Sequence, residues 1–348
     1  MLPSTLDWNT KEKTLKCFDQ RSIPFKNTEV VCVTYKDVAE AIENMTVRGA
    51  PAIGSAAAYG VVLAAYRDID DIESAISALS NSRPTAVNLS WALKRMKVII
   101  EKFGKDNINL PNILEKEAIK IQNLDVLINK TLSEYGQKIL PNKATVITHC
   151  NAGAIATCGY GTALGILRAA RENSKEIKLY ADETRPRLQG GKITAYEMHE
   201  DMFDVTVITD SMAAYLMSKK KIDAVITGAD RVAMNGDTAN KIGTYSLAVV
   251  AKHHGVPFYI AAPRSTFDIN CIDGNEIPIE ERDGDEIRVI ANQRIIPKEI
   301  KVWNPSFDVT PNSLITGIIT EYGILKAPYS KVIPKIFELP SLDKIIKE

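Results

Sequence analysis

The sequence predicts an α/β protein with a parallel sheet in its C-terminal part, preceded by a smaller domain of short strands and helices. From Ala144 onward, short apolar runs alternate with helical segments at the spacing of βα units, which favours a parallel sheet covered by helices. Before that point, residues 68–135 have the apolar periodicity of helices. The chain has 348 residues, 45% of them hydrophobic and 25% charged, which is the average of a globular protein with a large core.

The N-terminal part begins with short alternating segments over residues 1–36, among them a strand at Val30–Thr34. A helix is expected over Val38–Met45, starting from Asp37. A second begins near Pro51 and is nearly uncharged, so it should be buried. Three more helices are expected, at Asp70–Leu79, Leu89–Phe103 and about Pro111–Tyr135. Residues 136–143 look like a linker, which predicts domains 1–140 and 141–348.

The C-terminal part contains five strand candidates and a last helix expected over Ser313–Tyr322. The predicted strands are Thr145–Thr148, Ile177–Ala181, Val205–Thr209, Ala224–Thr227 and Pro257–Ala261. Polar groups follow four of these runs, namely His149 and Cys150, Asp182 and Glu183, Asp210, and Asp230. Ligands of open α/β sheets bind at the carboxyl ends of the strands, so this convergence predicts an active site. Asp210 is expected to be a helix cap instead of a site residue.

Cys150 is expected between the end of a strand and the start of a helix about four residues later, where a thiol can become reactive. A small buried apolar cysteine is an equally good interpretation. Arg48 precedes the helix near Pro51 and could bind an oxyanion there, although a surface arginine in a loop is the commoner role. Asn240 and Lys241 are expected at the start of a helix, where a cation beside the positive helix end suggests a phosphate site.

Several functional classes are disfavoured. The glycines of Gly159–Gly165 have the wrong spacing for a dinucleotide fingerprint and are expected inside a helix, where they would permit close packing on the sheet. The adjacent residues His253 and His254 look like a charge pair at the C-terminal end of a helix rather than a metal site. Lys plus Arg and Asp plus Glu both number 43, which argues against a nucleic-acid partner. No apolar run suits a membrane span, and five scattered cysteines indicate a reducing, cytoplasmic location.

A set of motifs spread over nearly the whole chain resembles the methylthioribose-1-phosphate isomerase family. That family shares its fold with archaeal ribose-1,5-bisphosphate isomerases and with regulatory subunits of the initiation factor 2 exchange factor. Small departures from the family pattern are Cys17-Phe18 and Cys158, none of which touches the matched site. The matching segments are Asp19–Arg21, Val47–Gly54, Arg83–Asn88, Thr148–Gly153, Asp182–Gly190, Gly228–Arg231, Asn235–Asp237, Ala239–Tyr245 and Asn304–Pro311.

The resemblance implies a Rossmann-like C-terminal domain, a homodimer, and catalysis without a metal or other cofactor. It also implies that Cys150 and Asp230 are the catalytic pair. The substrate-binding residues that it implies are Arg48, Gly49, Ala50, Arg83, Gln189, Asn240 and Lys241.

The implied reaction converts 5-methylthioribose 1-phosphate to 5-methylthioribulose 1-phosphate in methionine salvage. Because phosphate occupies the anomeric oxygen, the sugar ring cannot open by itself, and the enzyme needs an acid at the ring oxygen and a cationic clamp for the phosphate. We assign the acid role to Asp230. Cys150 would either shuttle a proton through an enolate or support a hydride shift.

Two alternatives stay open. A related isomerase could act on 5-deoxyribose 1-phosphate or on ribose 1,5-bisphosphate, the latter requiring a second cationic clamp that the sequence does not locate. A non-catalytic translation-factor subunit is the other alternative, and the presence of both Cys150 and Asp230 weighs against it.

Overall fold

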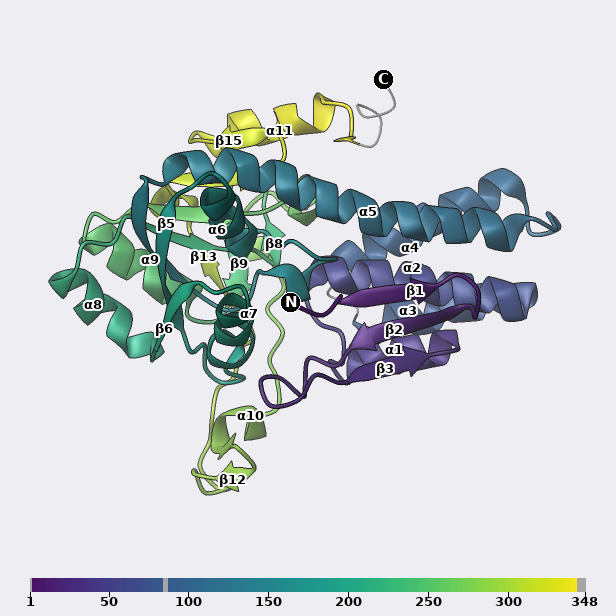
Figure 1. The fold of residues 1–348 in the computed structure, drawn as a ribbon, viewed down its shortest axis with the longest axis horizontal. Coiled ribbons are helices and arrows are strands. Elements are labelled where there is room, and N and C mark those ends of the chain that lie inside the picture. The colour runs from purple at the N-terminus through teal and green to yellow at the C-terminus, as the bar shows by residue number, and fades with distance from the viewer. Residues whose placement is uncertain (1, 84–86, 343–348) are drawn as a thin grey trace. The chain divides into compact units, whose positions relative to one another are not determined.

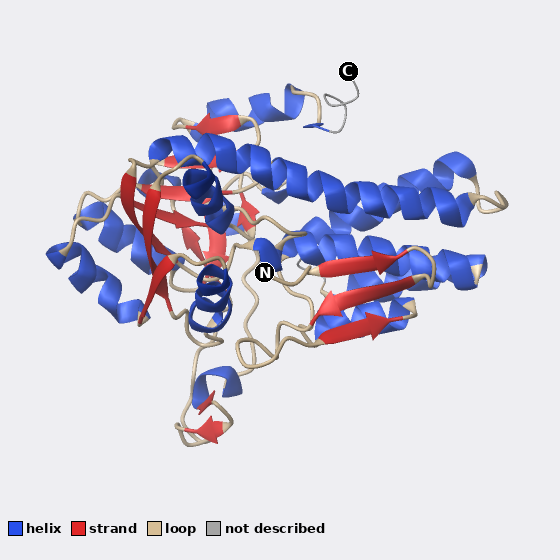
Figure 2. Ribbon diagram, viewed as in Figure 1, coloured by secondary structure: helices blue, strands red, loops and turns tan. Residues whose placement is uncertain are grey.

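The computed structural model describes residues 2–83 and 87–342, which divide into two compact units. The first unit takes its described residues from 2–131, 152–165 and 340–342, and the second comprises 132–151 and 166–339. The ribbon views show a small sheet with helices in the first unit and a large sheet with helices in the second (Figure 1, Figure 2). The protein is therefore of the α/β class that the sequence predicts.

The first unit contains an antiparallel three-stranded sheet. Its strands are β1 (Leu6–Asn9), β2 (Thr14–Phe18) and β3 (Glu29–Cys32), in the order β1-β2-β3. Leu15 and Cys17, two residues apart on the central strand, are fully buried, as expected for one face of a sheet packed on a core. The predicted strand at residues 30–34 is present and begins one residue earlier.

Helices cover this sheet and form most of the first unit. They are α1 (Tyr35–Glu43), α2 (Ala50–Arg67), α3 (Ile72–Ser82), α4 (Val87–Phe103) and α5 (Leu110–Gly136), the last of which continues into the second unit. All five helices expected from the sequence are confirmed. The start of α1 is earlier than predicted because Thr34 is its N-cap and Asp37 is the third helical residue of a capping box. Most of α2 is buried, as its uncharged sequence requires.

The second unit is built on a seven-stranded sheet that contains all five predicted strands. Across the sheet the strands are β15 (Gly323–Leu325), β14 (Gly317–Thr320), β10 (Phe258–Ala261), β7 (Ala224–Thr227), β4 (Lys143–Thr148), β5 (Glu176–Asp182) and β6 (Asp204–Ile208). All neighbours are parallel except β14 and β15. Without β15, the order by position in the chain is 3-2-1-4-5-6, as in Rossmann-like folds, and it reverses between β4 and β7.

Further elements of the second unit surround this sheet. Strands β8 (Arg231–Val232), β9 (Thr238–Lys241) and β13 (Phe307–Thr310) form a small antiparallel sheet, and β11 (Val289–Ile290) pairs with β12 (Gln293–Arg294). The helices are α7 (Ala195–Glu200), α8 (Ala213–Lys219), α9 (Thr244–His253), α10 (Asp285–Arg288), α11 (Tyr329–Glu338) and α6 (Ala163–Glu172), which starts in the first unit. Short 3-10 turns occur at Ile69–Asp71, Gln137–Ile139, Ala154–Ala156, Asp210–Met212, Arg264–Thr266, Gly274–Glu276 and Asn312–Leu314.

The prediction of a last helix over residues 313–322 is wrong. This segment contains β14, whose Ile318 and Ile319 are completely buried, and a turn leads from it into the antiparallel edge strand β15. In this segment apolar residues recur at the spacing of one helix face, namely Leu314, Ile315, Ile318 and Ile319. A strand buried on both faces has no alternation that would distinguish it from a helix. The next helix is α11, which begins seven residues beyond the expected end.

The glycines at 159 and 161 precede α6 rather than lying inside it, so the expected helix–sheet packing role is wrong for both. Their φ angles are 144° and 90°, which only glycine adopts readily. A Cβ atom on Gly161 would lie 2.6 Å from the backbone of Gly153, with which it forms a β-bridge. These glycines close a tight turn within the first unit.

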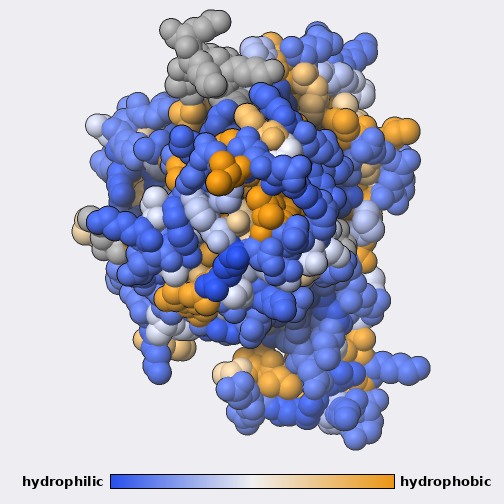
Figure 3. All heavy atoms as spheres, turned by 90° about the vertical axis from the view of Figure 1, so that its right-hand side faces the viewer, coloured by the Kyte–Doolittle hydropathy of each residue, from blue (hydrophilic) through white to orange (hydrophobic). Residues whose placement is uncertain are grey.

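The face shown in Figure 3 carries small hydrophobic groups separated by hydrophilic residues. This pattern suits a chain with equal numbers of acidic and basic residues. Among the described residues, no helix has the length and hydropathy needed to cross a membrane.

Candidate active site

The two predicted catalytic residues follow the two strands between which the sheet order reverses. Cys150 comes after β4 and Asp230 after β7, and these strands pair in parallel through Val146–Ala224 and Ile147–Val225. The carboxyl ends of such strands border the crevice in which Rossmann-like folds bind their ligands.

Cys150 adopts a left-handed backbone conformation with a φ of 63°. Its N–H donates to Oγ1 of Thr184 at 2.9 Å, and its carbonyl accepts from Oγ1 of Thr194 at 2.6 Å. This conformation costs a residue with a Cβ atom about 1–2 kcal/mol. Such conformations cluster at functional sites. Cys150 is also partly exposed, whereas the other four cysteines are buried.

The expected helix directly after Cys150 is absent. A 3-10 turn follows at Ala154–Ala156, and α6 does not begin until Ala163. The prediction that Cys150 faces a nearby helix start is therefore wrong, and a helix dipole supplies no argument for its reactivity. The strained peptide and its two threonine partners are what distinguish this cysteine.

The loop after β5 is also strained. Thr184 and Leu188 have positive φ angles of 64° and 61°. A π-helical turn at Gly190–Thr194 then leads into α7, and a Cβ on Gly190 would lie 1.7 Å from the carbonyl oxygen of Asp182. Such turns within helices occur often at functional sites. Gln189 is only 6% exposed, and its buried Oε1 has no hydrogen-bond partner among the described residues, which leaves an acceptor for a ligand hydroxyl.

His149 connects the end of β4 to two other segments. Its Nδ1 lies 2.9 Å from Oδ2 of Asp182, and its Nε2 lies 2.8 Å from the carbonyl oxygen of Ile242. Because a carbonyl only accepts, Nε2 carries a hydrogen. Burial by itself would lower the pKa of His149, but the Asp182 carboxylate outweighs it and raises the pKa above its ordinary value.

The prediction that Asp210 caps its own helix is wrong. Its carboxylate oxygens accept the N–H groups of Thr184 at 2.8 Å and of Arg185 at 2.7 Å, and therefore hold the loop after β5. His149, Asp182 and Asp210 place potential metal ligands within 4.8 Å of one another. His149 bonds to Asp182 and to a backbone carbonyl, and Asp210 bonds to two backbone N–H groups, so these three side chains tie together the segments that follow β4, β5 and β6.

Asn240 and Lys241 lie on β9 and not at the start of a helix, so that prediction is wrong. Helix α9 begins at Thr244, and Asp308 accepts the N–H groups of Gly243 and Tyr245 at its start. Both site residues are nevertheless buried. The Lys241 ammonium donates to the carbonyl of Ser306 at 2.8 Å and lies 4.3 Å from the ring centre of Phe307. A buried ammonium on a strand is a suitable anion partner without any helix-dipole argument.

Asp230 is placed by its backbone, since its N–H donates to the carbonyl of Ala239 at 2.9 Å. Its neighbour Arg231 begins β8 and forms an ion pair with Asp268 at 3.0 Å. The guanidinium of Arg231 therefore bonds to the carboxylate of Asp268, which approaches it from a distant part of the chain.

The remaining predicted site residues belong to the first unit. Gly49 is the N-cap of α2 with a φ of 96°, and a Cβ there would lie 2.1 Å from the carbonyl oxygen of Ala156. The carbonyl of Arg48 accepts from Nε2 of Gln20 at 3.2 Å, and Ala50 is the first residue of α2. Arg83 follows the end of α3, and the next three residues of its motif, 84–86, lie outside the described part of the chain.

The predicted site residues are thus divided between the two units. Cys150, Gln189, Asp230, Asn240 and Lys241 belong to the second, and Arg48, Gly49, Ala50 and Arg83 to the first. Reasoning from the sequence missed the threonines that hold Cys150. Thr184 lies inside a matched motif and could have been singled out, but Thr194 carries no signal in the sequence.

Comparisons with known proteins show the family and the fold of this chain. Residues 46–327 match the initiation factor 2 subunit family. Methylthioribose-1-phosphate isomerases of Carboxydothermus hydrogenoformans and Thermotoga maritima are each 52% identical to this chain, over 96% of it and 98% of their own length.

Two solved structures share the fold over nearly the whole chain. The 5-methylthioribose 1-phosphate isomerase of Pyrococcus horikoshii is 41% identical, with a TM-score of 0.91 and coverage of 97% of both chains. The translation initiation factor eIF-2B subunit delta of A. fulgidus is also 41% identical, with a TM-score of 0.86, and the match covers 97% of this chain and 100% of that one. The chain belongs to the initiation factor 2 subunit family, and its curated relatives at about half identity over nearly their full length are methylthioribose-1-phosphate isomerases.

Proposed function

We propose that this protein is an aldose–ketose isomerase that converts 5-methylthioribose 1-phosphate to 5-methylthioribulose 1-phosphate in methionine salvage. The observation that carries the proposal is the position of Cys150 and Asp230 after β4 and β7, the strands at which the sheet order reverses. The names of the full-length relatives support the same reaction.

In this proposal Cys150 and Asp230 are the catalytic pair. Asp230 protonates the ring oxygen, which opens a ring whose anomeric oxygen is blocked by phosphate. Hydrogen then moves from C2 to C1, and the C2 hydroxyl loses its proton as the C2 carbonyl forms. This loss balances the proton given to the ring oxygen and leaves a ketose that keeps its 1-phosphate. Cys150 either carries the C2 proton to C1 through an enolate or supports its direct transfer as a hydride. Neither route changes the overall oxidation state, because the product is an isomer of the substrate.

The substrate-binding set of the proposal is Arg48, Gly49, Ala50, Arg83, Gln189, Asn240 and Lys241. In the second unit the buried ammonium of Lys241 is suited to bind an anion such as phosphate, and in the first unit the guanidinium of Arg48 and the N–H groups at the start of α2 are suited to the same. The buried acceptor of Gln189 is suited to a sugar hydroxyl.

A turnover assay on three sugar phosphates tests the proposal. Purified protein is given 5-methylthioribose 1-phosphate, 5-deoxyribose 1-phosphate or ribose 1,5-bisphosphate, and ketose formation is followed. We expect the highest kcat/KM on the methylthio sugar. A preference for either of the other two sugars would assign the related isomerase activity instead, and no turnover of any of them would favour a translation-factor subunit, as in the A. fulgidus relative.

We further propose that the protein is a homodimer in the cytoplasm. The dimer rests on resemblance to the family, and light scattering after gel filtration should give twice the mass of one chain. The compartment is inferred from the cysteines, all five of which lie in the described residues and form no disulfide.

A further inference from the structure

The conformation of Cys150 depends on hydrogen bonds to the peptide groups on both sides of it. Thr184 accepts from its N–H, and Thr194 donates to its carbonyl. A hydroxyl has one proton to donate. The Thr194 hydroxyl therefore supports Cys150 only while that proton points toward the Cys150 carbonyl.

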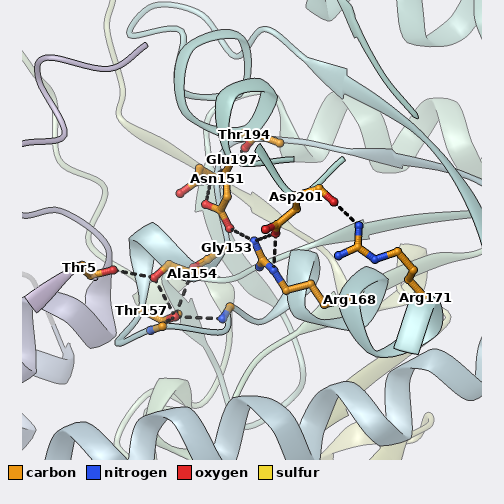
Figure 4. Close-up of polar contacts among 12 residues, drawn as sticks. Thr5, Asn151, Gly153, Ala154, Thr157, Arg168, Arg171, Thr194, Glu197 and Asp201 are labelled. Carbon is orange, nitrogen blue, oxygen red and sulfur yellow. Dashed lines mark hydrogen bonds and ion pairs between the residues drawn. The ribbon is translucent and has the colours of Figure 1, made fainter. Parts of the chain in front are cut away.

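Asn151 gives the Thr194 hydroxyl this direction. Its Nδ2 donates to Oγ1 of Thr194 at 3.2 Å and to Oε2 of Glu197 at 3.1 Å (Figure 4). Because Oγ1 accepts from Asn151, its own proton is left for the carbonyl of Cys150. Glu197 in turn fixes which way the Asn151 amide faces.

Glu197 is fully buried and accepts through both carboxylate oxygens. Oε2 binds Asn151, and Oε1 accepts from Nη2 of Arg168 at 2.8 Å. Arg168 also bonds to Oδ2 of Asp201, so its charge is shared between two carboxylates (Figure 4). A buried carboxylate needs such compensation. Glutamine has the same shape but one acceptor oxygen, so it can satisfy Asn151 or Arg168 but not both.

We propose that Glu197 is a positioning residue for the isomerisation, which holds Cys150 in its left-handed conformation through Asn151 and Thr194. The inference rests on the proposed function, in which Cys150 takes part in hydrogen transfer. Glu197 acts on Cys150 indirectly, through its hydrogen bond to Asn151. Its contribution is to keep the thiol-bearing residue in one orientation, which matters because small misplacements of a catalytic group are costly.

The experiment compares two pairs of variants in the full-length protein. Glu197→Gln removes one acceptor, and its matched control Asp201→Asn alters the other carboxylate on the same arginine without touching Asn151. Thr194→Val removes the hydroxyl, and Thr194→Ser restores it. Two quantities are measured in each variant: kcat and KM on 5-methylthioribose 1-phosphate, and amide hydrogen exchange of the peptide spanning residues 149–153, which needs no activity.

We expect kcat to fall about 10- to 100-fold in Glu197→Gln and Thr194→Val, with KM changed by less than about threefold. Exchange in the 149–153 peptide should be faster in these two variants only, while the adjoining strand stays protected. Thr194→Ser should recover most of the kcat lost in Thr194→Val, and Asp201→Asn should keep kcat.

A kcat of Glu197→Gln equal to that of the unaltered protein, unchanged exchange at residues 149–153 in Thr194→Val, or equal loss of kcat in Thr194→Val and Thr194→Ser would each overturn the inference. If Glu197→Gln does not fold, the threonine pair decides. Absence of turnover by the unaltered protein counts against the proposed function alone. The exchange measurement then still tests whether Glu197 and Thr194 hold the conformation of Cys150.

Discussion

Single residues decide the chemistry of this protein, and Cys150 differs from the other cysteines in both conformation and exposure. The sequence locates Cys150 correctly after a strand, because a run of β-branched residues that stops abruptly can be recognised as a strand. Its left-handed backbone conformation cannot be predicted from the sequence, since the residues that hold it, Thr184 and Thr194, lie more than thirty residues away and act through their hydroxyls.

The first prediction concerns the thiol. Cys150→Ser should lower kcat by about 10²–10⁴-fold, because a serine hydroxyl gives up its proton much less readily than a thiol at neutral pH. The free energy of unfolding should stay close to that of the unaltered protein. Cys271→Ser is the matched control: the buried Cys271 thiol donates to the carbonyl of Asp273 at 3.1 Å, which a serine hydroxyl can also do. Comparable activity of the two variants would remove Cys150 from the mechanism.

The second prediction concerns Asp230. Asp230→Asn should bind the substrate with a nearly normal KM and turn it over about 10²–10⁴-fold more slowly, because an amide cannot donate the proton that opens the ring. Steady-state kinetics on the methylthio sugar check it. Near-normal kcat in this variant would exclude the acid role.

The third prediction concerns the stability contributed by Asp125. Burial raises the pKa of this carboxyl from an ordinary 3.8 to about 6, although it accepts the N–H of Cys158 at 2.8 Å and the amide of Asn129 at 3.0 Å. Between these pKa values the folded protein binds more protons than the unfolded chain, so stability falls as the pH rises through this window. Above about pH 6 the ionised carboxylate lowers the free energy of unfolding by its full amount, which is at most about 3 kcal/mol.

Asp125→Asn should therefore stabilise the protein at pH 8 and leave it unchanged below pH 4, since an amide oxygen can accept the same two hydrogen bonds. Urea unfolding at the two pH values checks this expectation. An equal effect at both pH values would show that Asp125 does not change its proton affinity on folding.

At the scale of elements, the sequence predicts the strands β4, β5, β6, β7 and β10 well, because each is a short apolar run between turn residues. It fails at β14, which is equally apolar but follows directly on a segment with helical spacing. It also fails at Lys241, because β9 is a short strand that pairs with β13, far away in sequence. When the partner of a strand lies far away in the sequence, the residues around the strand show no local periodicity from which it could be predicted.

The fourth prediction belongs to this scale. Helix α9 has no cap from its own N-cap residue, Gly243, and uses the carboxylate of Asp308 from β13 instead. Asp308→Ala should lower the free energy of unfolding by about 1–2 kcal/mol, the usual value of a helix cap. It should also raise KM, because Asp308 lies next to the Ser306–Phe307 pair that holds Lys241. Asp308→Asn keeps an acceptor and should lose less; equal losses in both variants would argue against capping.

At the scale of the whole molecule, the α/β class and a parallel sheet are predictable from the sequence because they depend on the number and spacing of strands, whereas the Rossmann-like fold is implied by the family resemblance. The boundary near residue 140 stays a prediction, as do the roles of the site residues. The order of strands across the sheet cannot be read from the sequence, although it places Cys150 and Asp230 on neighbouring strands.

The fifth prediction separates the two routes of hydrogen transfer. With substrate deuterated at C2, a proton carried by Cys150 through an enolate exchanges with water, so the ketose loses deuterium. A hydride shift keeps the label at C1. Because the Cys150 residue is partly exposed, we expect at least partial loss, and mass spectrometry of the product measures it. Complete retention would contradict proton transfer by the thiol.

The path of the chain between its two units has a consequence for how this protein can change in evolution. The chain passes from one unit to the other within α5, after Asn151, within α6 and again near residue 340, so the first unit is assembled from separate stretches. No single cut in the gene releases either unit whole. A single recombination event therefore cannot exchange one unit without dividing the other.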